Sequence, residues 1–154
     1  MTIWQNIRTG IFGFAILTGL TMMASAHDHH GGYSAGEPGN AKKPSREIVV
    51  LMSEMDYTPS KIEVKRGEQI RFVIRNVGSE SHEFLLASTA DNLKHAEAMK
   101  KNPAMEHDEP NGLKLASKKS GEILWKFTKA GTFEYSCLIP KHREMGMIGK
   151  VVVK

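Results

Sequence analysis

The chain has 154 residues and a formal net charge of +4 at pH 7. This length allows one compact domain. The single cysteine, Cys137, excludes an internal disulfide, so the chain is not one of the small secreted proteins that disulfides hold together. We expect no nucleic-acid partner.

Residues 1–26 are predicted to be a secretory signal peptide. Arg8 supplies the positive start, residues 11–23 form the apolar middle, and residues 24–26 match an A-x-A cleavage site. The apolar run is too short, and its flanks are wrong, for a transmembrane helix; an uncleaved N-terminal anchor is the alternative. We therefore expect export to a bacterial periplasm, with no stable membrane insertion after cleavage.

Cleavage after Ala26 places His27, His29 and His30 at the new amino terminus. A free amine with a histidine at position three chelates Cu(II) through the amine, two deprotonated amides and the imidazole, so these histidines are a candidate Cu(II) site. The alternative is a solvated leader that binds nothing specifically. Because Gly, Pro, Ser and Lys are frequent in the segment that follows, residues 27–45 are predicted to be a flexible tail.

From Arg46 onward the hydrophobic pattern is that of strands. Residues 48–52 form an apolar run, and residues 62–65 and 70–76 alternate between apolar and polar side chains. Further strands are predicted over residues 82–86, 121–127, 131–136 and 147–153. Short strands with Gly-containing turns favour an all-β fold, a β-sandwich closed by Greek-key connections.

One helical insertion is predicted over residues 88–101. Ser88 or Thr89 can cap it, and Asn102 with Pro103 ends it. The side chains that lie at helical spacing are Leu93, Ala96 and Met99.

The insertion also carries possible soft metal ligands. His95 and Met99 lie four residues apart on one helix face, and Met105 and His107 follow in a polar loop. These residues are a candidate second soft copper site. We favour the alternative, in which Met99 packs on the sandwich and both histidines are solvated.

The chemistry of the chain is concentrated in the pattern C-x4-H-x4-M, formed by Cys137, His142 and Met147. Thiolate, imidazole and thioether are the soft ligands that select copper, and a His2Cys set with a weak axial Met is typical of electron-transfer centres. The second imidazole must come from elsewhere, and His82 fits because it begins an apolar strand after a turn-rich segment. A buried cysteine and a core methionine, Met145 or Met147, would explain single residues but not the whole pattern.

With this pattern the chain resembles the cupredoxins, which include plastocyanin, azurin and the rusticyanin-like proteins. Supporting motifs are residues 57–68, the segment His82-Glu83-Phe84 and residues 146–149. The resemblance implies a cupredoxin domain over residues 46–154 with one type 1 copper centre. The ligands that it implies are His82, Cys137, His142 and Met147.

Three residues depart from the family pattern. Glu83 stands where many members have Asn, Lys141 replaces a common Gly, and Ser136 replaces an aromatic or aliphatic residue. These departures bear on the colour and the reduction potential of the site and leave the ligand set intact.

The predicted function is that of a periplasmic mononuclear copper protein in copper handling or tolerance, with a redox-active site. The alternative is a dedicated electron carrier between respiratory or photosynthetic partners. We expect no enzyme, because the chain has no second copper domain, no catalytic triad and no C-x3-C copper motif. We expect a monomer that meets a redox or copper-transfer partner.

The resemblance also predicts where such a partner docks. In the resembled fold the second histidine ligand, here His142, lies near solvent at one end of the sandwich. Lys141 and Arg143 would add positive charge beside it and steer an acidic partner. The alternative is that both are ordinary solvated side chains. The apolar rim expected around His142 consists of Leu138, Ile139, Pro140 and Met145.

Overall fold

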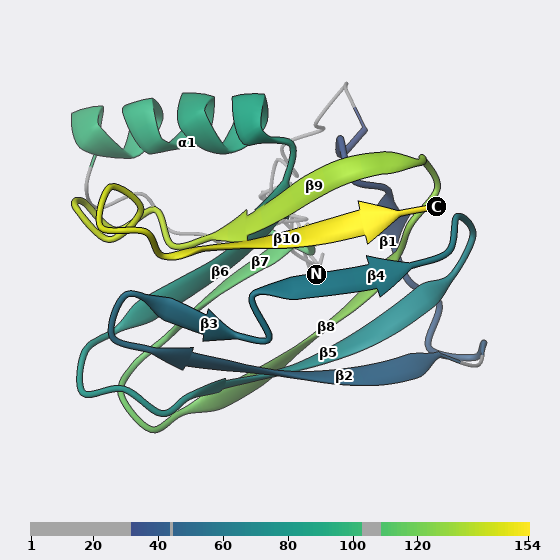
Figure 1. Ribbon diagram of the computed structural model, residues 1–154, viewed down its shortest axis with the longest axis horizontal. Coiled ribbons are helices and arrows are strands. Elements are labelled where there is room, and N and C mark those ends of the chain that lie inside the picture. Colours follow the sequence, from purple (N-terminus) through teal and green to yellow (C-terminus); the bar gives the residue numbers. More distant parts are fainter. Residues whose placement is uncertain (1–31, 44, 103–108) are drawn as a thin grey trace, which may run out of the picture.

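The computed structural model describes residues 32–43, 45–102 and 109–154. Within them, two five-stranded sheets pack face to face, and one helix lies outside the sandwich (Figure 1). This confirms the all-β sandwich with one helical insertion. The predicted signal peptide, residues 1–26, lies outside the described residues.

Each sheet is built mostly from antiparallel neighbours. The first sheet has the order β1 (Glu37–Pro38), β8 (Ser120–Lys126), β5 (Gln69–Asn76), β2 (Arg46–Ser53) and β3 (Asp56–Thr58). The second has the order β4 (Lys61–Val64), β10 (Ile148–Val153), β9 (Gly131–Ser136), β6 (His82–Ala87) and β7 (Gly112–Leu115). Two pairs are parallel, β2 with β5 and β4 with β10. The chain therefore crosses repeatedly between the sheets.

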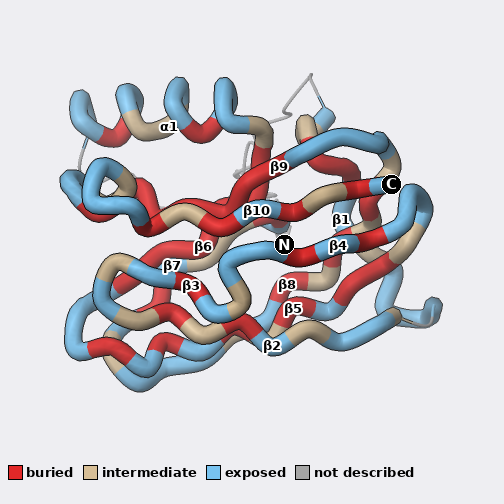
Figure 2. The backbone as a smooth tube through the Cα atoms, viewed as in Figure 1, coloured by how far each residue is buried: buried red, intermediate tan, exposed pale blue. Residues whose placement is uncertain are grey.

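The interior between the sheets is filled by aromatic and branched side chains. Figure 2 marks the stretches of both sheets whose residues are buried. Phe84 stacks on Tyr135 with ring centroids 5.0 Å apart, and Tyr57 meets Tyr135 edge-on at 5.1 Å. Phe84 lies two residues after His82, and Tyr135 two residues before Cys137. This rigid aromatic cluster therefore supports the strands that carry two of the predicted ligands.

The helix α1 (Thr89–Lys101) begins and ends where its caps predict. Ser88 Oγ accepts a hydrogen bond from the Asp91 amide at 3.1 Å, and the Asn102 amide bonds to the Ala98 carbonyl at 3.0 Å. No helix among the described residues combines the length and the apolar character needed to cross a membrane.

Packing of α1 places one residue of the candidate second soft copper site, Met99. Met99 is 5% exposed and packs with Leu85 and Leu138, so its thioether serves the interior, as the favoured alternative expects. Leu93, which the spacing places on the same face, is instead 49% exposed. Met105 and His107 lie outside the described residues.

The predicted tail differs from the structure over part of its length. Glu37 and Pro38 pair with β8, Ala35 is fully buried, and Trp125 Nε1 donates to the Ala35 carbonyl at 3.3 Å. A Cβ atom at Gly36 would lie 2.1 Å from the Lys126 carbonyl oxygen, so glycine permits this close approach. The tail boundary at residue 45 is corrected accordingly: a Gly- and Pro-rich composition does not reveal an edge strand whose partner lies far along the chain.

Candidate metal centre

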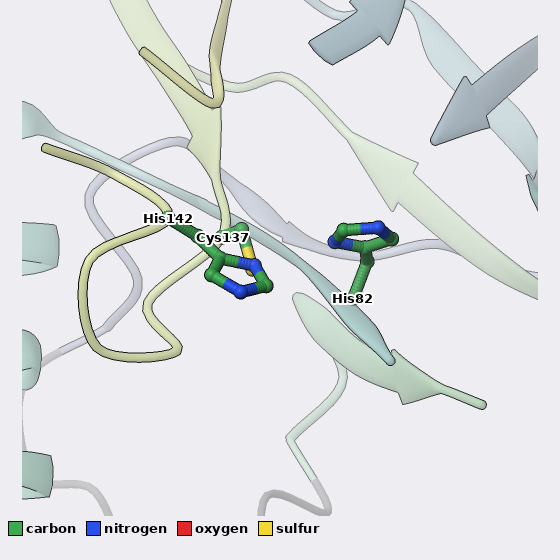
Figure 3. Close-up of side chains that lie close together, drawn as sticks. All are labelled: His82, Cys137 and His142. Atoms are coloured by element: carbon green, nitrogen blue, oxygen red, sulfur yellow. The ribbon is translucent and has the colours of Figure 1, made fainter. Parts of the chain in front are cut away.

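The predicted ligands come from three neighbouring elements at one end of the second sheet. His82 is the first residue of β6, and Cys137 follows β9 directly. Because β6 pairs with β9, with Leu85 opposite Ser136, the sheet itself sets His82 near Cys137. His142 lies in the ligand loop, residues 137–147, which joins β9 to β10. Figure 3 shows the side chains of Cys137 and His142 side by side, with His82 facing them.

The ligand atoms form a compact buried cluster. One atom each of His82, Cys137 and His142 lies within 4.8 Å of the others, and the three residues are 0%, 0% and 7% exposed. Cys137 Sγ and His142 Nδ1 are 3.3 Å apart. Nitrogen and sulfur ligands lie about 2.0–2.3 Å from a first-row ion such as zinc, so two of them are separated by at most ~4.6 Å. The cluster has very nearly this size.

The unpaired nitrogens of His82 test whether the site fits a metal. Both ring nitrogens are buried, and neither has a hydrogen-bond partner among the described residues. Buried polar atoms are normally paired, because an unpaired one loses its hydration without compensation. An imidazole in this state beside a thiol and a second imidazole fits a metal ion, and the soft donor set fits copper.

The surroundings of the cluster shift its proton affinities in two directions. Burial raises the pKa of the Cys137 thiol to about 11, although the Glu83 amide donates to its sulfur at 3.4 Å. Burial, followed by the charge of His142, lowers the pKa of His82. His82 is therefore a neutral imidazole at pH 7, ready to coordinate, whereas Cys137 must lose a proton first.

Burial distinguishes the two methionines of the ligand loop. Met147 is fully buried; its carbonyl accepts from the Cys137 amide at 3.2 Å and its amide donates to the His142 carbonyl at 3.1 Å. Met145 is 63% exposed. Of the two, Met147 is thus the one whose side chain is buried and whose backbone is hydrogen-bonded to two of the other predicted ligands. Gly146, between them, has a φ of 104°, which only glycine adopts readily.

The three departures from the family pattern acquire structural roles. Glu83 is 4% exposed; its Oε2 accepts from the Leu138 amide at 3.3 Å, and its Oε1 lies 3.9 Å from Lys114 Nζ. Lys141 has a φ of 78°, a left-handed conformation that explains why glycine is common there. Ser136 is fully buried, on the face of β9 opposite to Tyr135 and Cys137.

The rim around His142 differs from the expected one. Arg143 Nη2 forms an ion pair with Glu134 Oε1 at 2.7 Å, and the two side chains are 17% and 7% exposed. Leu138 is 3% exposed. Neither residue is therefore available as the docking charge or the apolar rim that the sequence predicts. Lys141 and Met145 remain on the surface.

Two acidic residues near the site were not found from the sequence. Glu80 lies with its Oε2 3.5 Å from His142 Nε2. Glu134 is 5% exposed, although it stands on β9 between the apolar Phe133 and Tyr135 and reads as a solvated strand residue. The one indication in the sequence that Glu134 is buried is the predicted helix. Such a helix must cover one face of a strand, and polar residues on that face then become buried. His27, His29 and His30 lie outside the described residues.

Comparisons with known proteins agree with this geometry. The family described as copper binding proteins, plastocyanin/azurin family, matches residues 45–154. A copper-resistant cuproprotein, CopI of Rubrivivax gelatinosus, is 48% identical over 132 residues, which cover 85% of this chain and 80% of that protein. The copper-resistant cuproprotein CopI of Pseudomonas aeruginosa is 33% identical over 169 residues, covering 90% and 91%.

Solved structures support the fold alone. Auracyanin B has a TM-score of 0.63 at 20% identity, with 80% of this chain and 99% of that chain covered. A reduced auracyanin from Roseiflexus castenholzii has a TM-score of 0.61 at 18% identity, with 73% and 99% covered. At these identities the likeness shows a shared β-sandwich and says nothing further of function.

Proposed function

The chain belongs to the plastocyanin/azurin family of copper-binding proteins, and on this premise we propose that it holds one redox-active type 1 copper and serves in copper handling. The proposed ligands are His82, Cys137, His142 and Met147. The observation that carries the proposal is the buried cluster of one thiol and two imidazoles, with both nitrogens of His82 unpaired among the described residues.

Bound copper would supply a one-electron couple, since a donor set of two imidazoles, one thiolate and one thioether suits neither Cu(I) nor Cu(II) fully. The chain's own residues prepare the site. The β6–β9 pairing and the aromatic cluster fix His82 against Cys137, the Glu83 amide donates to the sulfur, and burial excludes water. A site held this firmly changes little between oxidation states.

The role in copper handling rests on the relatives. Both curated relatives described above are named copper-resistant cuproproteins, and they match across most of their length. We propose a role in copper tolerance for this chain, with binding and redox change of copper rather than catalysis as its activity. The predicted signal peptide, residues 1–26, supports export to the periplasm. A dedicated electron carrier remains the alternative, favoured by the complete ligand set.

The colour of the copper-loaded protein tests the metal centre. Wild type is expected to show the strong visible absorption of a thiolate-to-copper transition, and Cys137→Ala to lose it while remaining folded. Met145→Leu is the matched control, because Met145 lies in the same loop but is exposed. Strong colour that survives Cys137→Ala would show that the ligand assignment is wrong.

Growth in the presence of copper separates the two functions. Cells that lack the protein are expected to become copper-sensitive, and wild type but not Cys137→Ala to restore growth. A loss of respiratory or photosynthetic electron flow at ordinary copper levels, with unchanged copper tolerance, would favour the electron carrier instead.

Docking of an acidic partner is proposed on Lys141 alone, because Arg143 is engaged by Glu134. Lys141 is exposed next to His142, so its charge can steer a partner toward the histidine edge. Lys141→Glu is expected to slow electron or copper exchange with the partner at low ionic strength, and the rates should converge with wild type at high salt. Equal rates at every ionic strength would exclude this docking face.

A further inference from the structure

We infer that α1 and Glu134 clamp the ligand loop, and that Glu134 and Arg143 are positioning residues for the copper ligand His142. The inference rests on the proposed copper site. It concerns how the chain holds one ligand still, and its test includes a measurement on the metal-free protein.

The sheet fixes two of the ligands but leaves His142 to be held by other contacts. His82 and Cys137 lie at the ends of paired strands, whereas His142 stands five residues beyond Cys137 in the ligand loop. Hydrogen bonds inside the loop, such as the His142 amide to the Ile139 carbonyl at 3.1 Å, fix its local turns. They do not tie the loop to β6, the strand that carries His82. The bond from the Leu138 amide to Glu83 Oε2 at 3.3 Å does so, but it lies at the start of the loop, four residues before His142.

The polar half of the clamp supplies that tie through the residue after His142. Arg143 Nη2 donates to Glu134 Oε1 at 2.7 Å. The same carboxylate accepts from Thr89 Oγ1 at 3.0 Å and from Asn92 Nδ2 at 3.3 Å, and both of these residues belong to α1. Asn92 is fully buried, and its amide also reaches the Leu85 carbonyl of β6 at 3.5 Å. One buried carboxylate thus joins the ligand loop, β9 and α1, and Asn92 extends the network to β6.

The apolar half grips the loop after Cys137. Leu138 is 3% exposed and packs with Met99 and Ala96 of α1 and with Leu85 of β6. Figure 1 shows α1 running above β9, with the loop between β9 and β10 beneath its C-terminal end. Because α1 follows β6 after a single residue, Ser88, the helix is anchored to the strand of His82 and reaches back to the loop of His142.

The geometry explains why the arginine points inward. Glu134 is 5% exposed, and a buried carboxylate is costly unless hydrogen-bonded and paired with a cation. Arg143 is the cation that pairs with Glu134, so the negative charge of Glu134 holds the Arg143 side chain in one position. Its neighbour His142 is then restrained by the backbone, in the way that outer contacts orient metal ligands elsewhere.

The test compares Glu134→Gln and Arg143→Ala with wild type, and uses Arg143→Lys as the rescue. Release of Cu(I) to a chelator is expected to be at least ~10-fold faster in the first two variants. This matches the loss of metal affinity that typically follows removal of a contact to a ligand. The ratio of the visible absorption bands and the reduction potential should shift, and Arg143→Lys should recover part of each change. In the metal-free protein, amide relaxation should show greater motion at residues 138–146.

Two controls separate positioning from simple destabilisation. Glu122→Gln breaks an exposed pair, Glu122 with Arg71 at 3.8 Å, far along the other sheet. Ile123→Val removes one methyl group from the core at β8, a strand of the other sheet, and lowers stability without changing a residue of the loop or of the Glu134 network. Neither should alter copper release, spectrum or loop motion. If Glu134→Gln fails to fold, Thr89→Val removes one bond to the carboxylate and should give a smaller change of the same sign.

Unchanged release, spectrum and loop motion in folded Glu134→Gln, or changes equal to those of Ile123→Val, would overturn the clamp. Failure of the proposed function looks different: wild type would then show no Cys137-dependent colour, while the loop motion in the metal-free variants would still report whether the clamp exists.

Discussion

Copper affinity should rise steeply with pH, because the buried thiol of Cys137 must ionise before it coordinates. Burial raises its pKa from 9.0 to about 11, which costs binding about 3 kcal/mol at pH 7 relative to an ordinary thiol. Between pH 7 and pH 10 the proton lost by the thiol should strengthen Cu(I) binding about 1,000-fold. A thiol of ordinary pKa would give only about 100-fold, since it would already be ionised above pH 9.

The assay is competition with a chromophoric Cu(I) chelator whose own protonation is known at each pH. His82 does not complicate the result, because burial lowers its pKa from 6.5 and it stays neutral throughout this range. Calorimetry in buffers of different ionisation enthalpy should report one proton released per copper at pH 8. The difference in ultraviolet thiolate absorbance between metal-free wild type and Cys137→Ala gives the thiol pKa directly.

An affinity that does not change between pH 7 and pH 10, with no proton released, would refute the reasoning, because it would mean that the metal-free protein already holds a thiolate. The raised pKa of Cys137 also affects folding stability. The stabilising contribution of the protonated thiol is fully present below pH 9 and is lost as the pH rises towards about 11, because the unfolded chain releases the thiol proton first.

Three further predictions concern single substitutions. Met147→Leu should shift the reduction potential strongly and Met145→Leu should not, as measured by redox titration; equal shifts would contradict the assignment of the buried methionine as axial ligand. Glu83→Gln should raise the potential, because the change removes a buried negative charge that favours Cu(II) beside the sulfur; a lowered potential would contradict this. Gly149→Ala should destabilise the protein by about 1–3 kcal/mol in chemical unfolding, since its Cβ would lie 2.0 Å from Tyr135 Cε2, and wild-type stability would show that the ring moves freely.

Local sequence determined most of the metal centre. Cys137, His142 and Met147 lie within one loop, so their spacing alone predicts that they converge, and the structure brings the first two together and buries the third beside them. His82 was found because a strand start is legible from hydrophobic pattern. The alternating strands and the capped helix could be predicted for the same reason. Each is a regular element, and its hydrophobic period appears within one continuous segment of the sequence.

Tertiary structure alone decided which polar residues face inward. Their sequence pattern indicates solvated side chains for Glu134 and Arg143. Glu134 is instead buried, because α1, more than thirty residues upstream in the chain, covers it, and the partly buried Arg143 pairs with it. β1 likewise forms only because it pairs with the edge of β8. The β1 segment has no strand pattern in its own sequence. Burial and edge pairing are supplied by partners distant in sequence, so no local pattern encodes them. The sequence by itself determined the candidate ligands; the packing of α1 determined which polar side chains surround them.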